Sequence, residues 1–314
     1  MKSIFDLHCD TLLAIKDHFT EAMDTLNDPI KAIALERAPK DVRWTQLFAI
    51  WIPQEYRGEA AKRFYSQNCG NFWRQTDRFS ALIKGCRSYA DVESAHKEKR
   101  LAGILAVESG SALAGDLEAV GELYRDGVRA MTLTWNEQNE LGSGNDTENG
   151  LTPFGKRVIR EMESIGIAVD VSHLNDSGFR DVLDTARKPI FARHSNARAV
   201  CPAKRNLDDW QIKEIVDRNG IIGLTYCACF VKENAAAASF DELYRHIEHF
   251  LELGCENCLA LGSDYDGAEM VDELKKMENT ADIYGLLRNK GIDDGLIEKI
   301  THANAERYFK QIMG

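Results

Sequence analysis

Histidine and carboxylate residues stand at or just past the ends of five apolar, strand-like runs in this chain. Their side chains offer imidazole nitrogens and carboxylate oxygens, which together suit zinc or a similar first-row divalent ion. Scattered residues of these types would mean little alone, but each follows the downstream end of a β-branched or leucine-rich run. The residues are His8, Asp10, Glu108, His173, His194 and Asp264.

The spacing of these residues favours a centre with two metals. His8 and Asp10 are two apart, so an extended strand projects both from the same face. Glu108 has two oxygens and can bridge two ions. We expect His8, Asp10 and Glu108 to hold one metal. Glu108, His173 and His194 would hold the other. Such a pair of ions lowers the pKa of bridging water to about 7 and makes hydroxide available at neutral pH.

Asp264 remains as a carrier of protons. It can accept a proton from the attacking water and deliver it to a leaving amine. The alternative is a turn residue, because D-Y-D-G is also turn-like. Asp266 fits that structural role better.

Cations follow His194 in the segment H-S-N-A-R-A-V-C-P-A-K-R-N. Arg205 or Lys204 could bind a substrate carboxylate, and the arginine fork gives the better bidentate match. Taken alone, either residue is more often a solvated surface charge.

Eight strand-like runs position these residues, and nearly all are continuously apolar, as is typical of parallel strands buried on both faces. Amphipathic stretches of helix length lie between them, including Phe154–Ile165, Asp208–Arg218 and Phe240–Leu253. This alternation predicts an α/β protein with a (β/α)8 TIM-like barrel. A binuclear metal site would lie at the C-terminal ends of the strands, which share one face. The predicted strands are Ser3–His8, Thr45–Ile52, Ala102–Glu108, Val128–Thr134, Ile167–Ser172, Pro189–Arg193, Gly220–Tyr226 and Cys258–Ser263.

The remaining segments predict helices, a loop and a single domain. The polar and aromatic interval Pro53–Arg100 is expected to hold two helices, the second near Asn71–Lys84. Asn136–Thr152 is loop-like and follows the fourth strand, so it should lie over the catalytic mouth and could act as a lid. Asp293–Met313 is predicted as terminal helical structure. We see no repeat, low-complexity tract or linker, and expect one domain over residues 1–314.

Composition limits the partners and the compartment. The chain has 39 Lys and Arg against 50 Asp and Glu, a net charge of −11, which disfavours nucleic acid or an anionic membrane as partner. No basic region with a following apolar stretch marks a secretory signal, and no apolar run reaches the roughly 18 residues that span a bilayer. Eight cysteines without a signal are interpreted as reduced thiols. We therefore expect a cytoplasmic protein.

Other cysteines and histidines are interpreted as structural. The C-E-N-C motif at Cys255–Cys258 has no partner C-x-x-C. Cys227 and Cys229 follow the seventh strand, near the mouth, and could touch substrate, although small packing residues are the commoner case. His246 and His249 are three apart on a predicted helix and could bind metal weakly, but a solvated helix face is the default interpretation.

Together these stretches resemble the membrane (renal) dipeptidase family, zinc peptidases with a (β/α)8 barrel and a binuclear site. The resemblance implies a metal-dependent dipeptidase that cleaves the amide bond of dipeptides, including some with a D-residue at the C-terminal position. We expect neither the secretory signal nor the lipid-anchor tail of the animal members, so the chain resembles a soluble microbial form. The matching stretches span residues 4–267 and are D-L-H-C-D, A-V-E-S, V-D-V-S-H-L-N, H-S-N-A-R-A-V-C-P-A-K-R-N and L-G-S-D-Y-D-G.

The resemblance also implies roles for single residues. Asp264 looks like the catalytic acid/base, Arg205 like the contact to the C-terminal carboxylate of the substrate, and Glu108 like the bridging carboxylate. A homodimer is expected on the same ground. The residues that look like ligands of two zinc ions are His8, Asp10, Glu108, His173 and His194.

The chain departs from the animal members after the fourth strand, where they place a histidine that is thought to assist the tetrahedral intermediate. Here L-T-W-N-E-Q-N has Trp135 in that position and Asn136 beside it. Tryptophan offers only an indole N–H donor, whereas Asn136 could supply a neutral hydrogen bond to substrate. Trp135 would either wall the substrate pocket or pack beneath the following loop.

Two other functions stay open. The first is another binuclear barrel hydrolase that acts on a cyclic amide, an ester or a phosphoester. Such barrels commonly carry H-x-H on the first strand and often a carboxylated lysine as the bridge, so H-x-D and Glu108 favour the peptidase. The second is a catalytically inactive metal-binding barrel, which retention of all five ligands and Asp264 disfavours.

Overall fold

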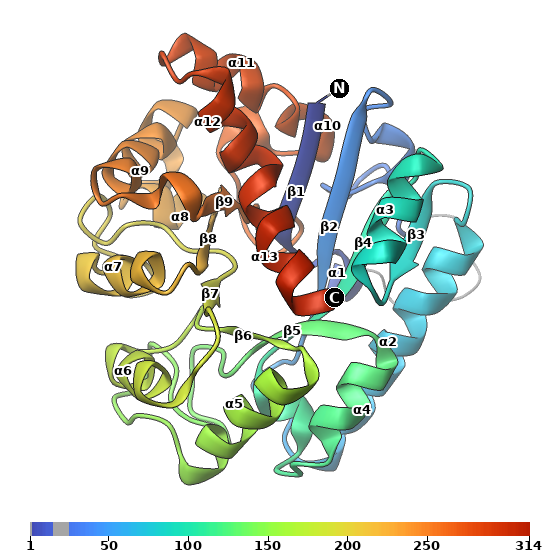
Figure 1. Ribbon diagram of the computed structural model, residues 1–314, viewed down its shortest axis with the longest axis vertical. Helices are drawn as coiled ribbons and strands as arrows, with labels where there is room; N and C mark the ends of the chain where they lie inside the picture. The colour runs from blue at the N-terminus through green and yellow to red at the C-terminus, as the bar shows by residue number, and fades with distance from the viewer. Residues whose placement is uncertain (1, 15–24) are drawn as a thin grey trace.

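Eight parallel strands close into a barrel with helices around it, as the sequence predicts (Figure 1). The computed structural model describes residues 2–14 and 25–314. Closure comes from the pairing of β2 with β4, in addition to the pairing of β2 with β1 and of β1 with β9. The barrel strands are β1 (Lys2–Cys9), β2 (Val42–Trp51), β4 (Leu101–Glu108), β5 (Val128–Thr132), β6 (Ala168–Asp170), β7 (Phe191–Ala192), β8 (Ile221–Leu224) and β9 (Leu259–Leu261).

A ninth strand, β3 (Ile83–Cys86), lies outside the barrel ring and pairs with the first half of β4. β5 pairs with β4 from Leu105 onward, so β3 and β5 share one edge of β4 while β2 takes the other. This strand was not predicted, because a four-residue run is too short for periodicity to identify.

The prediction of a second helix near Asn71–Lys84 is wrong. One helix, α2 (Glu59–Arg78), runs through that region, and α3 (Tyr89–Lys97) follows β3. The helical pattern continues without a break because Phe72, Gln75 and Thr76 keep facing the core on the same helix.

Helices follow most strands, and the predicted amphipathic ones are confirmed. Thr152 accepts a hydrogen bond from the Gly155 amide at the start of α5, and Gly166 ends that helix at φ 90°. No helix in the described part of the chain is long and apolar enough to cross a membrane. The helices not yet named are α1 (Thr11–Ala14), α4 (Ala119–Asp126), α5 (Pro153–Ile165), α6 (Asp176–Thr185), α7 (Asp209–Asp217), α8 (Ala228–Val231), α9 (Phe240–Glu252), α10 (Met277–Thr280) and α11 (Ile283–Asn289).

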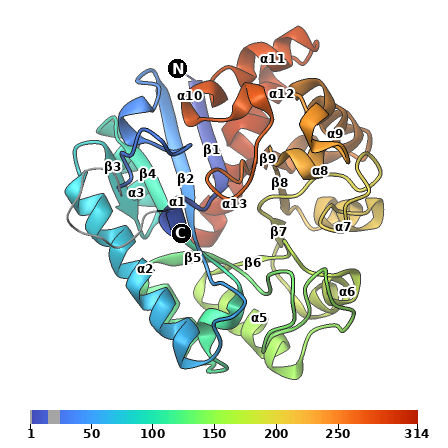
Figure 2. The same cartoon turned by 180° about the vertical axis from the view of Figure 1, so that it is seen from behind.

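The C-terminal segment is helical, as predicted, and crosses one end of the barrel. It consists of α12 (Asp294–Glu298), a π-helical segment (Lys299–Ala303) and α13 (Asn304–Met313). α13 lies in front of the strands in Figure 1 and behind them in Figure 2.

Contacts of α13 close the N-terminal end of the barrel. The Asn304 side chain donates to the Leu259 carbonyl at the start of β9, at 2.8 Å. The Tyr308 hydroxyl donates to the Pro189 carbonyl just before β7, at 2.9 Å. Buried aromatic and aliphatic side chains of β1, β2, β4 and β7 pack against the same helix. The functional site is therefore expected at the opposite end of the barrel, where the strands terminate.

The loop after β5 lies at that opposite end, in agreement with the prediction for Asn136–Thr152. The Asn145 amide donates to the His173 carbonyl at 2.9 Å. A Cβ on Gly144 would lie 1.8 Å from the Trp135 carbonyl oxygen. Only glycine therefore lets this loop fold back against its own beginning.

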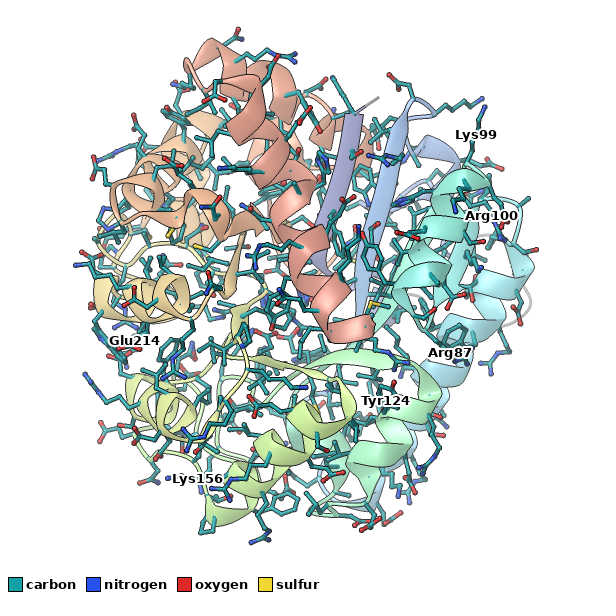
Figure 3. All side chains as sticks on the ribbon, in the orientation of Figure 1. Arg87, Lys99, Arg100, Tyr124, Lys156 and Glu214 are labelled. Carbon is teal, nitrogen blue, oxygen red and sulfur yellow. The ribbon has the colours of Figure 1, made fainter. Side chains whose placement is uncertain are left out.

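Charged side chains mark the outside of the molecule. Lys99, Lys156 and Glu214 lie at its periphery (Figure 3). Arg193, by contrast, is fully buried inside the barrel. A buried guanidinium requires partners of opposite charge, and these are found at the candidate site.

Candidate metal centre

The predicted histidines and carboxylates meet at the C-terminal end of the barrel. The Nε2 atom of His8 lies 3.3 Å from Asp10 Oδ2, 3.4 Å from Glu108 Oε2 and 3.2 Å from Asp264 Oδ1. Three carboxylates thus surround one imidazole nitrogen. The groups His8–Asp10–Asp264 and His8–Glu108–His194 each bring three ligand atoms within 4.8 Å of one another.

Glu108 joins this cluster to the two remaining histidines. Its Oε1 atom lies 2.8 Å from His173 Nε2 and 3.9 Å from His194 Nε2. The two Nε2 atoms of His173 and His194 are 3.0 Å apart. The rings of His8 and His194 stack with centroids 4.0 Å apart. Each carboxylate oxygen of Glu108 therefore faces a different part of the centre, as a bridging ligand requires.

The unsatisfied atoms of this centre fit bound divalent cations. Within the described residues, both ring nitrogens of His8, Asp10 Oδ1 and His194 Nδ1 are buried without a hydrogen-bond partner. Buried polar atoms are normally paired. Imidazole nitrogens and carboxylate oxygens that converge in this way are the donor set that zinc prefers.

Electrostatics differ among the three histidines. Burial and Arg193 oppose protonation of His8, but Asp10 and Glu108 outweigh them and raise its pKa to about 10. Burial and the nearby Arg205 cation lower the pKa of His173 to about 3. Burial also places the pKa of His194 well below its ordinary value. At neutral pH His173 and His194 are in the neutral form that binds metal, whereas a cation must displace a proton from His8.

The carboxylates also differ. Burial raises the pKa of Asp10 to about 6. Burial acts in the same direction on Glu108, but His173, Arg193 and His8 outweigh it and lower the pKa of that carboxyl. The central carboxylate therefore keeps its negative charge.

Arg193 and Asp170 belong to the centre although sequence reasoning missed both. Arg193 Nη2 donates to Glu108 Oε2 at 2.9 Å, and its Nε lies 3.0 Å from Asp170 Oδ2. Both side chains are fully buried. The sequence does indicate their role, because each is a charged residue inside an apolar strand-like run. Charged residues are buried only when they are paired.

Unusual backbone conformations aim two of these side chains. His173 has φ 68° and Asp264 has φ 71°, a left-handed region that costs a non-glycine residue about 1–3 kcal/mol. A Cβ on Gly267 would lie 2.2 Å from Asp10 Oδ2 and 2.7 Å from Asp264 Oδ1. Glycine at that position gives the two carboxylates room to approach.

Trp135 and Asn136 both lie beside His173. Asn136 Oδ1 is 2.7 Å from His173 Nδ1, so this nitrogen donates and leaves Nε2 free to bind metal. The Trp135 ring lies 6.0 Å from the His173 ring and meets Trp51 edge-on at 5.2 Å. The oxygen of Asn136 is thus engaged by His173, whereas the neutral hydrogen bond to substrate predicted from the sequence would come from its side-chain NH2 group.

Arg205 lies inside the site, whereas Lys204 is exposed. Arg205 Nη1 donates to Ser195 Oγ at 2.9 Å and Nη2 donates to the His194 carbonyl at 2.7 Å. Its Nε is buried and has no hydrogen-bond partner within the described ranges. Burial lowers the pKa of this guanidinium. Of the two candidate cations, the structure brings Arg205 to the centre.

Asp266 has the structural role that the sequence favours. Its Oδ2 accepts from the Thr11 hydroxyl at 2.6 Å and its Oδ1 accepts from the Ala32 amide at 2.6 Å. It thereby ties the segment after β1 to the loop that carries Asp264.

The solvated position predicted for His246 is wrong. Its ring is fully buried, and Nδ1 accepts from the Ala197 amide at 3.1 Å while Nε2 donates to the Val231 carbonyl at 3.0 Å. The ring links the Ala197 amide to the last residue of α8, and burial lowers its pKa to about 4. His249 lies on the more exposed side and pairs with Asp209 at 2.7 Å.

Known proteins are similar to this chain in sequence and in fold. The family described as membrane dipeptidase (peptidase family M19) matches residues 1–313. The solved structure of the dipeptidase AC, a metallopeptidase of family M19, aligns with a TM-score of 0.94 and 28% identity over 100% of this chain and 99% of that chain. A metallopeptidase from Rhodobacter sphaeroides, liganded with a phosphinate mimic of the dipeptide L-Ala-D-Ala, aligns with a TM-score of 0.94 and 27% identity over 99% of both chains. An uncharacterized protein in the pqqA 5′ region of Klebsiella pneumoniae is 32% identical over 241 residues, 73% of this chain and 89% of the relative.

Proposed function

Because the chain belongs to the membrane dipeptidase family (peptidase family M19), we propose that it is a zinc dipeptidase with two metal ions that hydrolyses the amide bond of dipeptides. The observation that carries the proposal is Glu108, whose two oxygens face different histidines. When bound, such ions polarise the scissile carbonyl and make water nucleophilic at neutral pH.

We assign the first ion to His8, Asp10 and Glu108. The second ion is assigned to Glu108, His173 and His194. The close approaches around His8 Nε2 and Glu108 Oε1 support this division. The neutral state of His173 and His194 supports it further, since protonated imidazole cannot ligate.

Asp264 is assigned the proton transfers. Its carboxylate lies 3.2 Å from His8 Nε2 and is close enough to the centre to take a proton from the attacking water. Delivery of that proton to the amide nitrogen lets the amine leave in neutral form.

Arg205 is assigned to the C-terminal carboxylate of the substrate. A buried guanidinium with an unpartnered Nε beside the centre matches a carboxylate and fixes the register of the scissile bond. Trp135 is assigned to the wall of the pocket, supported by its packing against the His173 ring. Asn136 is assigned to the orientation of His173 through its oxygen, on the strength of their 2.7 Å contact, and its side-chain NH2 group to a neutral hydrogen bond with substrate.

The phosphinate mimic of L-Ala-D-Ala on the Rhodobacter sphaeroides relative favours substrates that include L,D-dipeptides. Cytoplasmic residence and a homodimer stay predictions of the cysteine content and of the sequence resemblance.

A substrate panel with metal analysis tests the function. The purified protein is stripped with a chelator, reloaded with zinc, and offered L,L- and L,D-dipeptides, tripeptides, lactones and phosphotriesters. We expect two zinc ions per chain and cleavage of the dipeptides alone. A fully zinc-loaded protein that leaves all dipeptides intact, or prefers a lactone or phosphotriester, would contradict the proposal.

A further inference from the structure

Two cysteines lie side by side at the mouth of the barrel, just after β8. The Sγ atoms of Cys227 and Cys229 are 3.2 Å apart. Cys227 is buried, whereas Cys229 is exposed. The proposed hydrolysis uses neither thiol.

The two thiols have unequal reactivity. A hydrogen bond from Cys227 lowers the pKa of Cys229 to about 7, and the same hydrogen bond together with burial raises the pKa of Cys227. The thiolate is the nucleophile in thiol–disulfide exchange, and it must be accessible. Cys229 therefore suits attack on a dissolved oxidant, and Cys227 suits the second, resolving attack.

The segment that holds this pair is hydrogen-bonded to the loop that carries Asp264. The Tyr226 amide donates to the Ser263 carbonyl at 3.1 Å, one residue before Asp264. The Ala228 amide donates to the Glu269 carbonyl at 2.8 Å, at the far end of the same loop. These two hydrogen bonds link the cysteine segment to both ends of the Asp264 loop.

The remaining cysteines lack this combination of features. All eight cysteines are free and within the described residues, and Cys229 alone is exposed. The other close pair, Cys255 and Cys258, is buried at the start of β9, away from the strand ends that hold the candidate centre. It provides a matched internal control.

We propose that Cys227 and Cys229 form a redox-active dithiol that low-molecular-weight disulfides oxidise, and that the resulting disulfide lowers turnover by displacing the Asp264 loop. The Cys229 thiolate attacks one sulfur of the disulfide and expels one thiolate. Cys227 then loses its proton, attacks the Cys229 sulfur and expels the second thiolate. The two protein thiols lose two electrons, and one disulfide becomes two thiols.

The bond requires a small movement. The two sulfurs must approach from 3.2 Å to about 2 Å. Cys229 is exposed, whereas Cys227 lies between Tyr226 and Ala228, whose amides are bonded to the Asp264 loop. Most of the strain therefore falls on the short α8 segment and that loop. A reducing agent reverses the change.

The test treats the zinc-loaded enzyme with increasing glutathione disulfide, alkylates the remaining thiols, and maps the peptides by mass. We expect loss of two hydrogens on the peptide that contains Cys227 and Cys229. Dipeptide turnover should fall several-fold. The concentration of glutathione disulfide that gives half of this fall should equal the one that gives half of the mass change, and dithiothreitol should restore turnover. The activity reading rests on the proposed function, whereas the mass reading needs no substrate, so failure of either is recognised separately.

Single substitutions separate the two thiols. Cys229→Ser should keep its basal turnover and resist glutathione disulfide. Cys227→Ser should stop at a stable glutathione adduct on Cys229. Cys258→Ser, in the buried pair, should respond like the unaltered enzyme. A Cys227–Cys229 pair that stays reduced while the glutathione couple is fully oxidised overturns the proposal. A disulfide that leaves turnover unchanged, or loss of activity that persists in Cys229→Ser, also overturns it.

Discussion

The guanidinium of Arg193 joins two buried carboxylates, with Nη2 at 2.9 Å from Glu108 Oε2 and Nε at 3.0 Å from Asp170 Oδ2. Asp170 is in turn held by the backbone amides of Ser172 and Arg193. Glu108, the proposed bridge, is thus fixed from behind by a cation that solvent does not reach.

Arg193→Met should loosen Glu108 and leave Asp170 as a buried charge without its partner. Removal of one member of a buried ion pair costs about 3–5 kcal/mol of stability, and loss of support behind a ligand weakens metal binding about 10–100-fold. Competition with a chromophoric chelator measures the zinc affinity. Arg129→Met is the matched control, because Arg129 is a buried guanidinium that binds backbone carbonyls near the start of β5. Equal loss of zinc in both variants would mean that Arg193 acts only through the fold.

Asp264→Asn should lower turnover about 10²–10⁴-fold and leave zinc bound. The amide matches the carboxylate in shape but cannot carry the proton. Steady-state rates and zinc content are measured on the same preparation. Asp266→Asn, two residues away, should lower the melting temperature with little effect on chemistry, since Asp266 binds Thr11 and Ala32. Zinc loss in Asp264→Asn would instead identify Asp264 as a ligand.

Zinc binding should release protons in a pattern set by the histidines. His8 has a pKa of about 10 in the metal-free protein, so below that pH it carries a proton that zinc must displace. At pH 8 we expect about one proton from His8. His173, with a pKa of about 3, is already neutral at pH 8 and contributes none. Because the proton on His8 competes with the metal, the apparent affinity for zinc falls as pH decreases. Calorimetry in buffers of different ionisation enthalpy counts the protons. Binding at pH 8 without proton release would refute the assigned role of His8.

Asn136→Leu should weaken the second zinc site selectively. Without an acceptor for its Nδ1–H, His173 is no longer held with Nε2 toward Glu108, and affinity should fall about 10–100-fold. Asn136→Asp keeps an oxygen at the same place and should restore binding. Zinc stoichiometry under chelator competition gives the readout. Trp135→Phe, which alters the proposed pocket wall beside His173, should retain both ions and shift side-chain preference. Equal zinc loss in Asn136→Leu and Asn136→Asp would refute the orienting role.

Arg205→Ala should reduce kcat/KM on free dipeptides about 10–100-fold, since a hydrogen bond to a charged group contributes about 1.5–3 kcal/mol. The loss on a C-terminally amidated dipeptide should be much smaller. Lys204→Ala is the adjacent control and should leave both rates unchanged, because Lys204 is exposed. Equal loss on free and amidated substrates would show that Arg205 supports the loop through Ser195 and the His194 carbonyl.

The sequence by itself determined the barrel strands and the types of residue at their ends. A continuous apolar run of strand length, bounded by turn residues, favours a parallel strand that is buried on both faces. Closure of the parallel sheet then brings the ends of β1 and β4, which carry His8 and Glu108, to one face of the barrel. The C-terminal helices and the helices α5, α7 and α9 follow from the 3.6-residue periodicity of their apolar side chains.

Only the tertiary structure decided which distant residues touch. Arg193 and Glu108 are 85 positions apart, and Asn136 and His173 are 37 apart. Such contacts depend on the register of paired strands and on loop closure, which no local pattern encodes. The left-handed backbone at His173 and Asp264 is likewise imposed by surrounding packing against intrinsic preference. The four-residue strand β3 exists because the first half of β4 offers it a free edge, and the side chains alone do not indicate that edge.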